Sequence, residues 1–258
     1  MPTVSLITPS LNQGQFLGEC LDSVQAAAAT AGVSVEHLVV DGGSTDQTRE
    51  LLASQSLARW ISEPDNGQTD AINKGLRQTS GQIVSYLCAD DLLEPAALAE
   101  VLEAWKAEPS ADVVYGDAYF LESGWKRRKI VGPFSGHRLR KGNFLIQPAV
   151  FLQRRVFEKF GLLDASLKFC MDHEFWLRIS GETHWKYVQA PLACSRLHAD
   201  AKTWSQLPTA WEEARIMQKK YGIHWRPLRD ALWMRTVGWH YYRMKRILFA
   251  RIAKGRHS

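Results

Sequence analysis

Short apolar runs that end in polar residues alternate with helical patterns along the first part of the chain. The predicted strands lie at Val4–Thr8, which is rich in β-branched residues as strands typically are, and at Val35–Val40, Ala58–Ser62 and Ile83–Cys88. Apolar residues at helical spacing predict three helices. The first covers 15–31, the second follows the turn-rich segment at 63–67 and ends at residue 77, and the third covers 96–107. Strands alternating with helices predict parallel βαβ units and therefore an α/β fold.

Polar residues follow each of these predicted strands directly. They are Thr8 to Ser10, Asp41, Asp65 with Asn66, and Asp90 with Asp91. Because the carboxyl ends of parallel strands meet at one edge of a sheet, we expect these residues to lie near one another. The sequence therefore predicts a ligand site along this edge.

Residues typical of turns and helix caps separate the elements that lie between and after these strands. Ser44 to Gln47 has the pattern of a capping box, with Ser44 as N-cap and Gln47 at N3 of the next helix. Further along, we expect a strand over 112–117, a turn at 122–124, a basic strand over 125–131 (WKRRKIV), and a helix over about 172–180.

The bulk composition sets limits on the class of protein. The 258 residues are 45% hydrophobic and 23% charged, which fits one large globular domain, with or without an appendage. The net charge of +5 suits an anionic ligand or an anionic membrane surface, but is too small to indicate nucleic acid binding. The four cysteines show no CxxC spacing, which favours reduced thiols in a cytoplasmic protein. Neither a signal peptide nor a membrane span is expected.

The adjacent carboxylates Asp90 and Asp91 raise a question of electrostatics. Two like charges side by side at the edge of a core repel each other, unless a cation or a set of hydrogen-bond donors is shared between them. A divalent metal ion would supply that compensation.

Several stretches, taken in order, resemble family 2 glycosyltransferases, the inverting enzymes of the GT-A fold. They are SLITPSLNQGQFLGECLDSV, VVDGGSTDQT, EPDNGQTDAINKG, YLCADDLLEP, VVYGD, QPAVFLQRRVFEKFGLLDASLKFCMDHEFWLRI and RLHADAKT. The resemblance implies a mainly parallel central sheet flanked by helices. It implies a catalytic domain over 1–203, with a nucleotide-sugar half at about 1–110 and an acceptor half at 111–203. Residues 204–258 would form a helical extension.

The resemblance also implies a donor site and a metal site. The nucleotide-sugar residues would be Thr8, Pro9, Ser10, Asn12, Asp41, Asp65, Asn66, Asp70, Lys74, Ala89 and Asp90. The ligands of Mn²⁺ or Mg²⁺ would be Asp90, Asp91 and His198. The family motif is commonly Asp-x-Asp, and here Cys88 stands at its first position, which puts the usual ribose contact of that residue in doubt.

For the reaction itself, the resemblance implies that Asp172 is the base that deprotonates the acceptor hydroxyl. The acceptor side would include Asp117, Gln147, Pro148, Glu174 and Trp176. Inversion requires such a base on the face opposite the leaving group.

Plainer roles remain open for many of these residues. Asp41 could serve as a turn former, and Ser10, Asn12, Asp91 and Asp172 could each cap a helix. Two pairs at i, i+4 spacing, Asp70 with Lys74 and Glu174 with Arg178, could be ordinary helix ion pairs. His198 could be structural.

The C-terminal tail has the pattern of a basic amphipathic helix. Apolar residues recur at helical spacing at Val237, Tyr241, Met244, Leu248 and Ile252, with arginine and lysine residues mostly on the other side. Such a helix suits an anionic membrane surface, and equally suits docking on the catalytic domain or on a second copy of the chain.

Together, these features predict a metal-dependent inverting glycosyltransferase. The donor would be a nucleotide-diphosphate sugar, with UDP favoured, and the acceptor a glycan or lipid-linked molecule of cell-surface polysaccharide synthesis. The alternatives are a nucleotidyltransferase, or a catalytically degenerate subunit that binds glycan or nucleotide. We expect a cytoplasmic protein that can lie peripherally on the inner face of the membrane and can form a homodimer. We do not expect it to bind nucleic acid.

Overall fold

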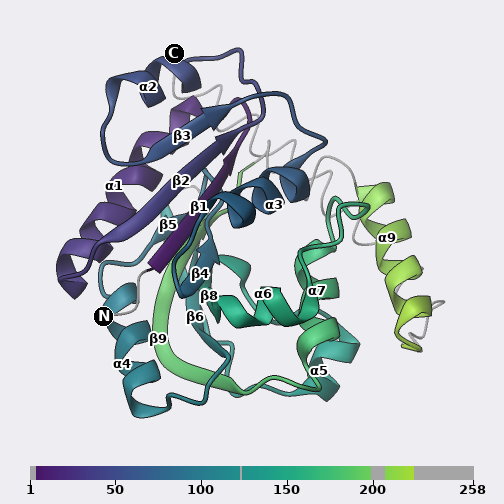
Figure 1. The fold of residues 1–258 in the computed structure, drawn as a ribbon. Helices are drawn as coiled ribbons and strands as arrows, with labels where there is room; N and C mark the ends of the chain where they lie inside the picture. The colour runs from purple at the N-terminus through teal and green to yellow at the C-terminus, as the bar shows by residue number, and fades with distance from the viewer. Residues whose placement is uncertain (1–3, 123, 199–206, 224–258) are drawn as a thin grey trace. The chain divides into compact units, whose positions relative to one another are not determined.

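The computed structural model describes residues 4–122, 124–198 and 207–223 (Figure 1). The chain divides into two compact units, Met1–Leu197 and His198–Ser258, and each is described by itself. The boundary lies six residues before the predicted domain end at 203.

The first unit contains a single mixed sheet and its covering helices. Its strands are β1 (Val4–Ser10), β2 (Val35–Asp41), β3 (Arg59–Ser62), β4 (Ile83–Tyr86), β5 (Leu92–Leu93), β6 (Val113–Glu122), β7 (Trp125–Lys129), β8 (Val150–Gln153) and β9 (Trp185–Arg196). Its helices are α1 (Gly14–Ala31), α2 (Thr48–Ser54), α3 (Gln68–Gln78), α4 (Ala97–Ala107), α5 (Gly136–Lys141), the 3-10 helix η1 (Gln147–Ala149), α6 (Arg154–Phe160) and α7 (Met171–Ile179).

The sheet has the order β3-β2-β1-β4-β8-β6-β9-β5, with β7 beside β6. Strands β1 to β4 pair in parallel, as the alternating pattern predicts. The second half is mixed, because β8 runs antiparallel to β4 and β6 whereas β9 runs parallel to β6. The α/β class is confirmed, and the parallel arrangement belongs mainly to the N-terminal half.

Helices cover both faces of this sheet (Figure 1). Leu6 belongs to a core with Cys20 and Val24 of α1 and Val101 of α4. Its neighbour Ile7 points to the opposite face, where a Cβ on Gly75 of α3 would lie 2.4 Å from its Cγ2. Glycine at this position therefore lets α3 approach the sheet closely, above the ends of β1 and β4.

The predicted capping box at Ser44 is wrong. Helix α2 begins at Thr48, and its N-cap Gln47 makes no side-chain cap hydrogen bond. The hydroxyl of Ser44 instead donates to the carboxylate of Asp41 and accepts the N–H of Asn12. Asp46 supplies the acceptor for the N–H of Thr48, at 3.0 Å. Ser44 is thus used to join two loops rather than to start a helix.

In the second unit, the structure describes one helix, α9 (Leu207–Lys220). The predicted amphipathic stripe from Val237 to Ile252 lies outside the described residues. Within the described part of the chain, none of the helices combines the length and apolar character needed to cross a bilayer.

Candidate active site

The loops after β1 and β2 are tied together by side-chain hydrogen bonds. Asn12 has a left-handed backbone, with φ of 53°, and its N–H donates to Ser44 Oγ at 2.7 Å. Its side-chain oxygen accepts the N–H of Thr45 at 2.9 Å. Asparagine tolerates this backbone conformation better than most residues do. Asn12 therefore fixes the first loop against the second.

Asp41 lies at the end of β2 with its side chain fully buried. One carboxylate oxygen accepts the N–H of Ser44 at 3.0 Å and the hydroxyl of Ser62 at 2.6 Å, and the other accepts the Ser44 hydroxyl. The predicted turn-forming role is thus present in the structure. Contact with a nucleotide base stays a prediction.

The end of β1 contributes two buried hydroxyl groups with different surroundings. Thr8 Oγ1 lies 2.8 Å from His37 Nε2 inside the core, and burial lowers the pKa of His37 to about 4, so the ring is neutral. Ser10 Oγ is buried, and the described part of the chain offers it no hydrogen-bond partner. The backbone carbonyl of Ser10 accepts the N–H of Gly42. Of the predicted Thr8, Pro9 and Ser10 contacts, the hydroxyl of Thr8 is already engaged in the core.

The start of α3 carries the remaining predicted donor residues. Asp65 accepts the N–H of Gly67 at 2.8 Å, and the N–H of Asn66 donates to Asp70 at 3.1 Å. Lys74 lies 2.9 Å from Glu63 and 3.7 Å from Asp70, so the i, i+4 ion pair is present. These contacts organise the loop before α3, and a role in donor binding stays a prediction for all of them.

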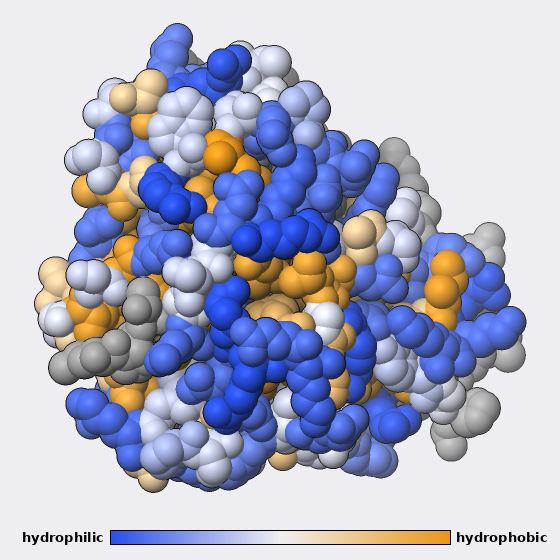
Figure 2. Space-filling model, viewed as in Figure 1, coloured by the Kyte–Doolittle hydropathy of each residue, from blue (hydrophilic) through white to orange (hydrophobic). Residues whose placement is uncertain are grey.

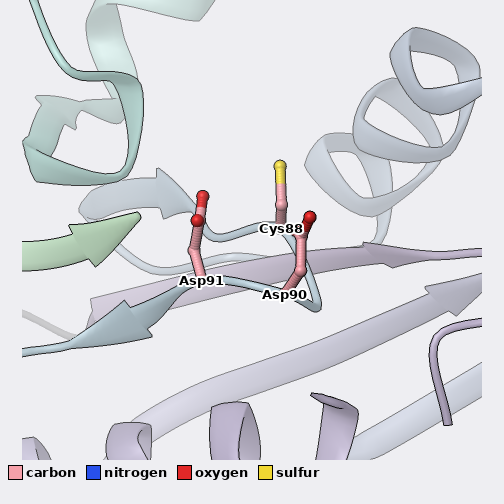
Figure 3. A group of neighbouring side chains, drawn as sticks. All are labelled: Cys88, Asp90 and Asp91. Atoms are coloured by element: carbon pink, nitrogen blue, oxygen red, sulfur yellow. The ribbon is translucent and has the colours of Figure 1, made fainter. Parts of the chain in front are cut away.

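Cys88, Asp90 and Asp91 form a cluster in the loop between β4 and β5. One ligand atom from each of the three lies within 4.8 Å of the other two. Figure 3 shows all three side chains pointing to the same side of the loop. Ala89 between them is buried in the core under α1. The loop therefore turns its polar side chains outward from an apolar anchor.

The two carboxylates of this cluster differ in environment. Asp91 is buried, and burial together with the neighbouring charge of Asp90 raises its pKa to about 8. The N–H of Arg196, at the end of β9, donates to Asp91 at 3.1 Å. Asp90 is half-buried. Carboxylate oxygens are the ligands that Mg²⁺ and Mn²⁺ prefer, and a cation here would relieve the unfavourable burial of charge, so the residues fit a divalent metal ion.

Asp172 lies in the first turn of α7. Its carboxylate accepts the N–H of His173 at 2.7 Å and the side-chain amide of Asn143 at 2.8 Å. Burial raises the pKa of Asp172, and these hydrogen bonds only partly offset that effect. A carboxylate with a raised pKa is a better proton acceptor than an ordinary one, as a general base requires.

The end of β4 connects the Asp90 loop with Asp172. Burial raises the pKa of Tyr86, and the charges of Asp172 and Cys88 raise it further, which places both groups around this residue. Gln147 donates its side-chain amide to the backbone carbonyl of Tyr86. Asp172, far from β4 in the sequence, therefore lies near the end of the strand that leads into the Asp90 loop.

Helix α3 also anchors the segment that leads into α7. The hydroxyl of Thr69 donates to the carbonyl of Leu167 at 2.6 Å. Asn73 donates its amide to the carbonyl of Leu163 at 2.9 Å and accepts that residue's N–H at 3.1 Å. These contacts fix the segment that precedes α7, and with it the start of the helix that carries Asp172, against α3.

Several predicted acceptor-side residues have structural surroundings instead. Trp176 is fully buried and packs against Phe175 and Trp185. Glu174 is buried and pairs with Arg178 at 2.8 Å, so the i, i+4 pair is present but is not a surface pair. Pro148 is buried in η1, and Asp117 is buried in a set of hydrogen bonds described below. These side chains leave little surface for an acceptor.

His198, the third predicted metal ligand, begins the second compact unit. Its role in the metal site therefore stays a prediction.

Three residues of the site were not singled out from the sequence. Asn143 contacts Asp172, Gln68 donates to Cys88 Sγ at 2.9 Å, and the backbone of Arg196 contacts Asp91. Each comes from an element remote in sequence from the group that it contacts. No local spacing or motif signals such contacts, since they depend on how the elements pack.

Figure 2 shows the face seen in Figure 1 as largely hydrophilic, with hydrophobic residues visible between the blue ones below α3.

Comparison with solved structures defines the class of protein. The chain is similar to the Staphylococcus aureus protein TarS (residues 1–349) in complex with UDP-GlcNAc, with a TM-score of 0.66 and 16% identity over 84% of this chain and 66% of that one. It is also similar to the mannosyltransferase PcManGT from Pyrobaculum calidifontis in complex with GDP-Man and Mn²⁺, with a TM-score of 0.62 and 16% identity over 87% of this chain and 70% of that one. At this identity, these likenesses define a GT-A-like fold and nothing finer.

Sequence comparison then gives the family. The model "Glycosyl transferase family 2" matches residues 5–164. An uncharacterized glycosyltransferase of Mycobacterium tuberculosis (strain H37Rv) is 32% identical over 181 residues, covering 69% of this chain and 68% of that protein. A PGL/p-HBAD biosynthesis glycosyltransferase of Mycobacterium bovis (strain BCG / Pasteur 1173P2) is 31% identical over 183 residues, or 69% of each chain. The chain belongs to glycosyl transferase family 2, and it is a glycosyltransferase enzyme.

Proposed function

We propose that this enzyme transfers a sugar, with inversion, from a nucleotide-diphosphate donor to a hydroxyl of a glycan or lipid-linked acceptor. A UDP-sugar is the favoured donor, and cell-surface polysaccharide synthesis is the favoured setting. The observation that carries the proposal is that the loop with Asp90 and Asp91 follows β4 directly, while Asp172 lies near Tyr86, the last residue of that strand. Family membership favours this activity over nucleotidyl transfer and over a degenerate binding subunit.

Asp90 and Asp91 would hold a divalent cation, Mn²⁺ or Mg²⁺. When bound, the cation would neutralise the negative charge that develops on the leaving diphosphate. The buried Asp91, with its pKa raised by burial and by Asp90, has the most to gain from a nearby positive charge. The N–H of Arg196 holds its carboxylate in place.

The loops after β1 and β2 would bind the nucleotide. Asn12, Ser44 and Asp41 are already joined by hydrogen bonds before any ligand arrives, so little ordering is left for binding to accomplish. Ser10, with a buried hydroxyl that lacks a partner among the described residues, is the group in this region with a hydrogen bond still to offer.

Asp172 would take the proton from the acceptor hydroxyl as that oxygen attacks the anomeric carbon. The amide of Asn143 and the N–H of His173 aim the carboxylate, and burial keeps it basic. The attacking oxygen forms its bond on the face opposite the departing diphosphate, which inverts the configuration at that carbon.

Replacing Asp90 by Asn tests the metal and donor parts of this proposal. Selective binding stabilises a folded protein by mass action, so a nucleotide sugar that fits should raise the unfolding temperature of the wild type when Mn²⁺ is present. We expect that rise to need Mn²⁺ and to be lost in Asp90→Asn. Thermal unfolding against a panel of nucleotide sugars measures it, and assays of the released product distinguish a nucleoside diphosphate from pyrophosphate.

Two results would contradict the proposal. One is stabilisation of Asp90→Asn by donor and Mn²⁺ equal to that of the wild type. The other is release of pyrophosphate, which would indicate nucleotidyl transfer.

A further inference from the structure

Cys88 occupies a position in the metal cluster that the proposed function leaves without a role. Its Sγ lies within 4.8 Å of a ligand oxygen of both Asp90 and Asp91. In Figure 3 the sulfur points to the same side of the loop as the two carboxylates. Two ligands at the tetrahedral angle of one Zn²⁺ ion, with bonds of about 2.3 Å to sulfur and about 2.1 Å to oxygen, lie about 3.6 Å apart. A small closure of this loop would therefore bring all three atoms onto one ion.

The sulfur is held in place by a neighbour from another element. Gln68, in the first turn of α3, donates its side-chain amide to Cys88 Sγ at 2.9 Å. On the other side of the cluster, the N–H of Arg196 donates to Asp91 at 3.1 Å. Groups that orient ligands in this way are typical of metal sites, because they fix the direction of each donor atom before the ion binds.

The other cysteines differ from Cys88 in their surroundings. Cys20 and Cys194 are buried in the core, with exposed fractions of 0% and 1%. Cys170 is half-buried like Cys88, but lies just before α7 and is not part of the cluster. None of the four forms a disulfide in the described part of the chain. Cys88 is thus the cysteine whose position matches that of a ligand.

We propose that Cys88 is a third ligand of the metal, and that its sulfur makes the site favour thiophilic divalent ions such as Zn²⁺, Co²⁺ and Cd²⁺ more than a carboxylate site would. This inference rests on the proposed function, since it assumes that Asp90 and Asp91 hold the ion. On binding, the thiol releases its proton to solvent and the sulfur lone pair forms the bond to the metal. Thiolates favour softer ions, whereas carboxylates alone favour Mg²⁺ and Mn²⁺, so a mixed set shifts the preference.

Cadmium titration of the whole protein tests this directly. A thiolate bound to Cd²⁺ absorbs in the ultraviolet by charge transfer, and an oxygen ligand does not. We expect this absorption in the wild type and in the matched control Cys170→Ser, saturating at one equivalent of Cd²⁺. It should be absent in Cys88→Ser, with affinity for Cd²⁺ lower by about tenfold or more.

Manganese binding, followed by electron paramagnetic resonance, separates this inference from the proposed function. Cys88→Asp should keep Mn²⁺ binding and lose the cadmium band, because an oxygen ligand replaces sulfur. Wild-type protein that binds Mn²⁺ without a cadmium–thiolate band would overturn the role of Cys88 and leave the proposed metal site intact. A band that persists in Cys88→Ser would overturn it too. If folded wild-type protein shows neither Mn²⁺ binding nor the cadmium–thiolate band, both the role of Cys88 and the proposed metal site are overturned.

Alkylation supplies an independent readout that does not depend on spectra. Bound Zn²⁺ should protect Cys88 from iodoacetamide, whereas Mg²⁺ should protect it less, and peptide mass spectrometry follows Cys88 and Cys170 in the same sample. Equal labelling of Cys88 with and without Zn²⁺, at concentrations that saturate the protein, contradicts a bond between this sulfur and the metal.

Discussion

Two carboxylates have opposite electrostatic surroundings: Asp117, which is fully buried at the β6–β7 hairpin, and Asp172, which is half-buried at the start of α7. Asp117 in β6 receives two hydrogen bonds from the guanidinium of Arg128, at 2.7 and 3.0 Å, one from the N–H of Val131 at 2.8 Å, and one from the hydroxyl of Tyr187 at 2.7 Å. Asp172 receives hydrogen bonds from two neutral groups, the side-chain amide of Asn143 and the backbone N–H of His173.

The pKa values of the two groups follow from these surroundings. Burial would raise the pKa of Asp117, but the donors around it outweigh burial and hold that pKa below its usual range. Burial also raises the pKa of Asp172, and there the donors do not outweigh it. The comparison teaches that burial alone does not make a base. The guanidinium that donates directly to Asp117 makes this carboxylate a structural anchor, whereas the hydrogen bonds and the charge of His173 only partly offset burial at Asp172 and leave its pKa raised.

The largest expected effect is on the rate of transfer in Asp172→Asn. Removal of a general base typically slows a reaction by about 10²–10⁴-fold, and the amide of asparagine cannot accept the proton. The isosteric change should leave the free energy of unfolding and the binding of donor nearly unaltered. Steady-state transfer kinetics, with donor binding followed by thermal unfolding, measure both. Transfer by Asp172→Asn at the wild-type rate would remove this residue from the role of base.

The matched change Asp117→Asn should affect stability instead. It leaves the guanidinium of Arg128 without its charged partner, and we expect the free energy of unfolding to fall by about 2–3 kcal/mol. Because the folded-state pKa of Asp117 is depressed, the loss should be full at neutral pH and should shrink as pH falls through the range where this carboxylate is protonated. Urea unfolding at several pH values measures it.

The activity of the folded Asp117→Asn protein completes this comparison. Transfer per folded molecule should stay near that of the wild type, since Asp117 is enclosed by its own hydrogen bonds. A large loss of activity without a loss of stability would assign Asp117 to the reaction and would contradict the contrast drawn here.

The smallest expected effect is a shift in the pH dependence of transfer in Asn143→Ala. The base must be deprotonated, so activity falls as pH drops through the raised pKa of Asp172, at a higher pH than for an ordinary aspartate. The amide of Asn143 lowers that pKa, so its removal should move the acid limb of the kcat profile to still higher pH. A limb that stays in place, or moves to lower pH, would contradict the assignment.

The N-terminal half of the fold was largely predictable from sequence, because its elements are set by local patterns. Runs of β-branched residues indicated β1, β2, β3 and β4, and the polar residues that end them marked the edge of the sheet. The prediction of a capping box failed because Ser44 takes part in contacts with Asp41 and Asn12, which are separated from it by a loop or by a whole βαβ unit. A local motif does not report such competing partners.

The second half was less predictable, because its elements depend on remote partners. Strand β9 (Trp185–Arg196) pairs with β6 and, near its end, with the short β5. Its sequence, WKYVQAPLACSR, has a proline and no clean alternation. The burial of Glu174 and Trp176 likewise follows from the packing of α7, whereas the family resemblance implied that both lie on the acceptor side. Sequence patterns indicated the residue types of the candidate site. The packing of helices and strands determines which of these side chains are buried and which can face a ligand.

A crystal structure with Mn²⁺ and an unreactive UDP-sugar analogue tests the central claim most directly. The claim is that the Asp90–Asp91 loop and Asp172 act on one donor at the end of β4. We predict an anomalous manganese peak within bonding distance of an Asp90 or Asp91 oxygen, with the diphosphate on the ion and the anomeric carbon of the sugar facing Asp172. Manganese and nucleotide bound away from this loop, or a sugar turned away from Asp172, would contradict the account.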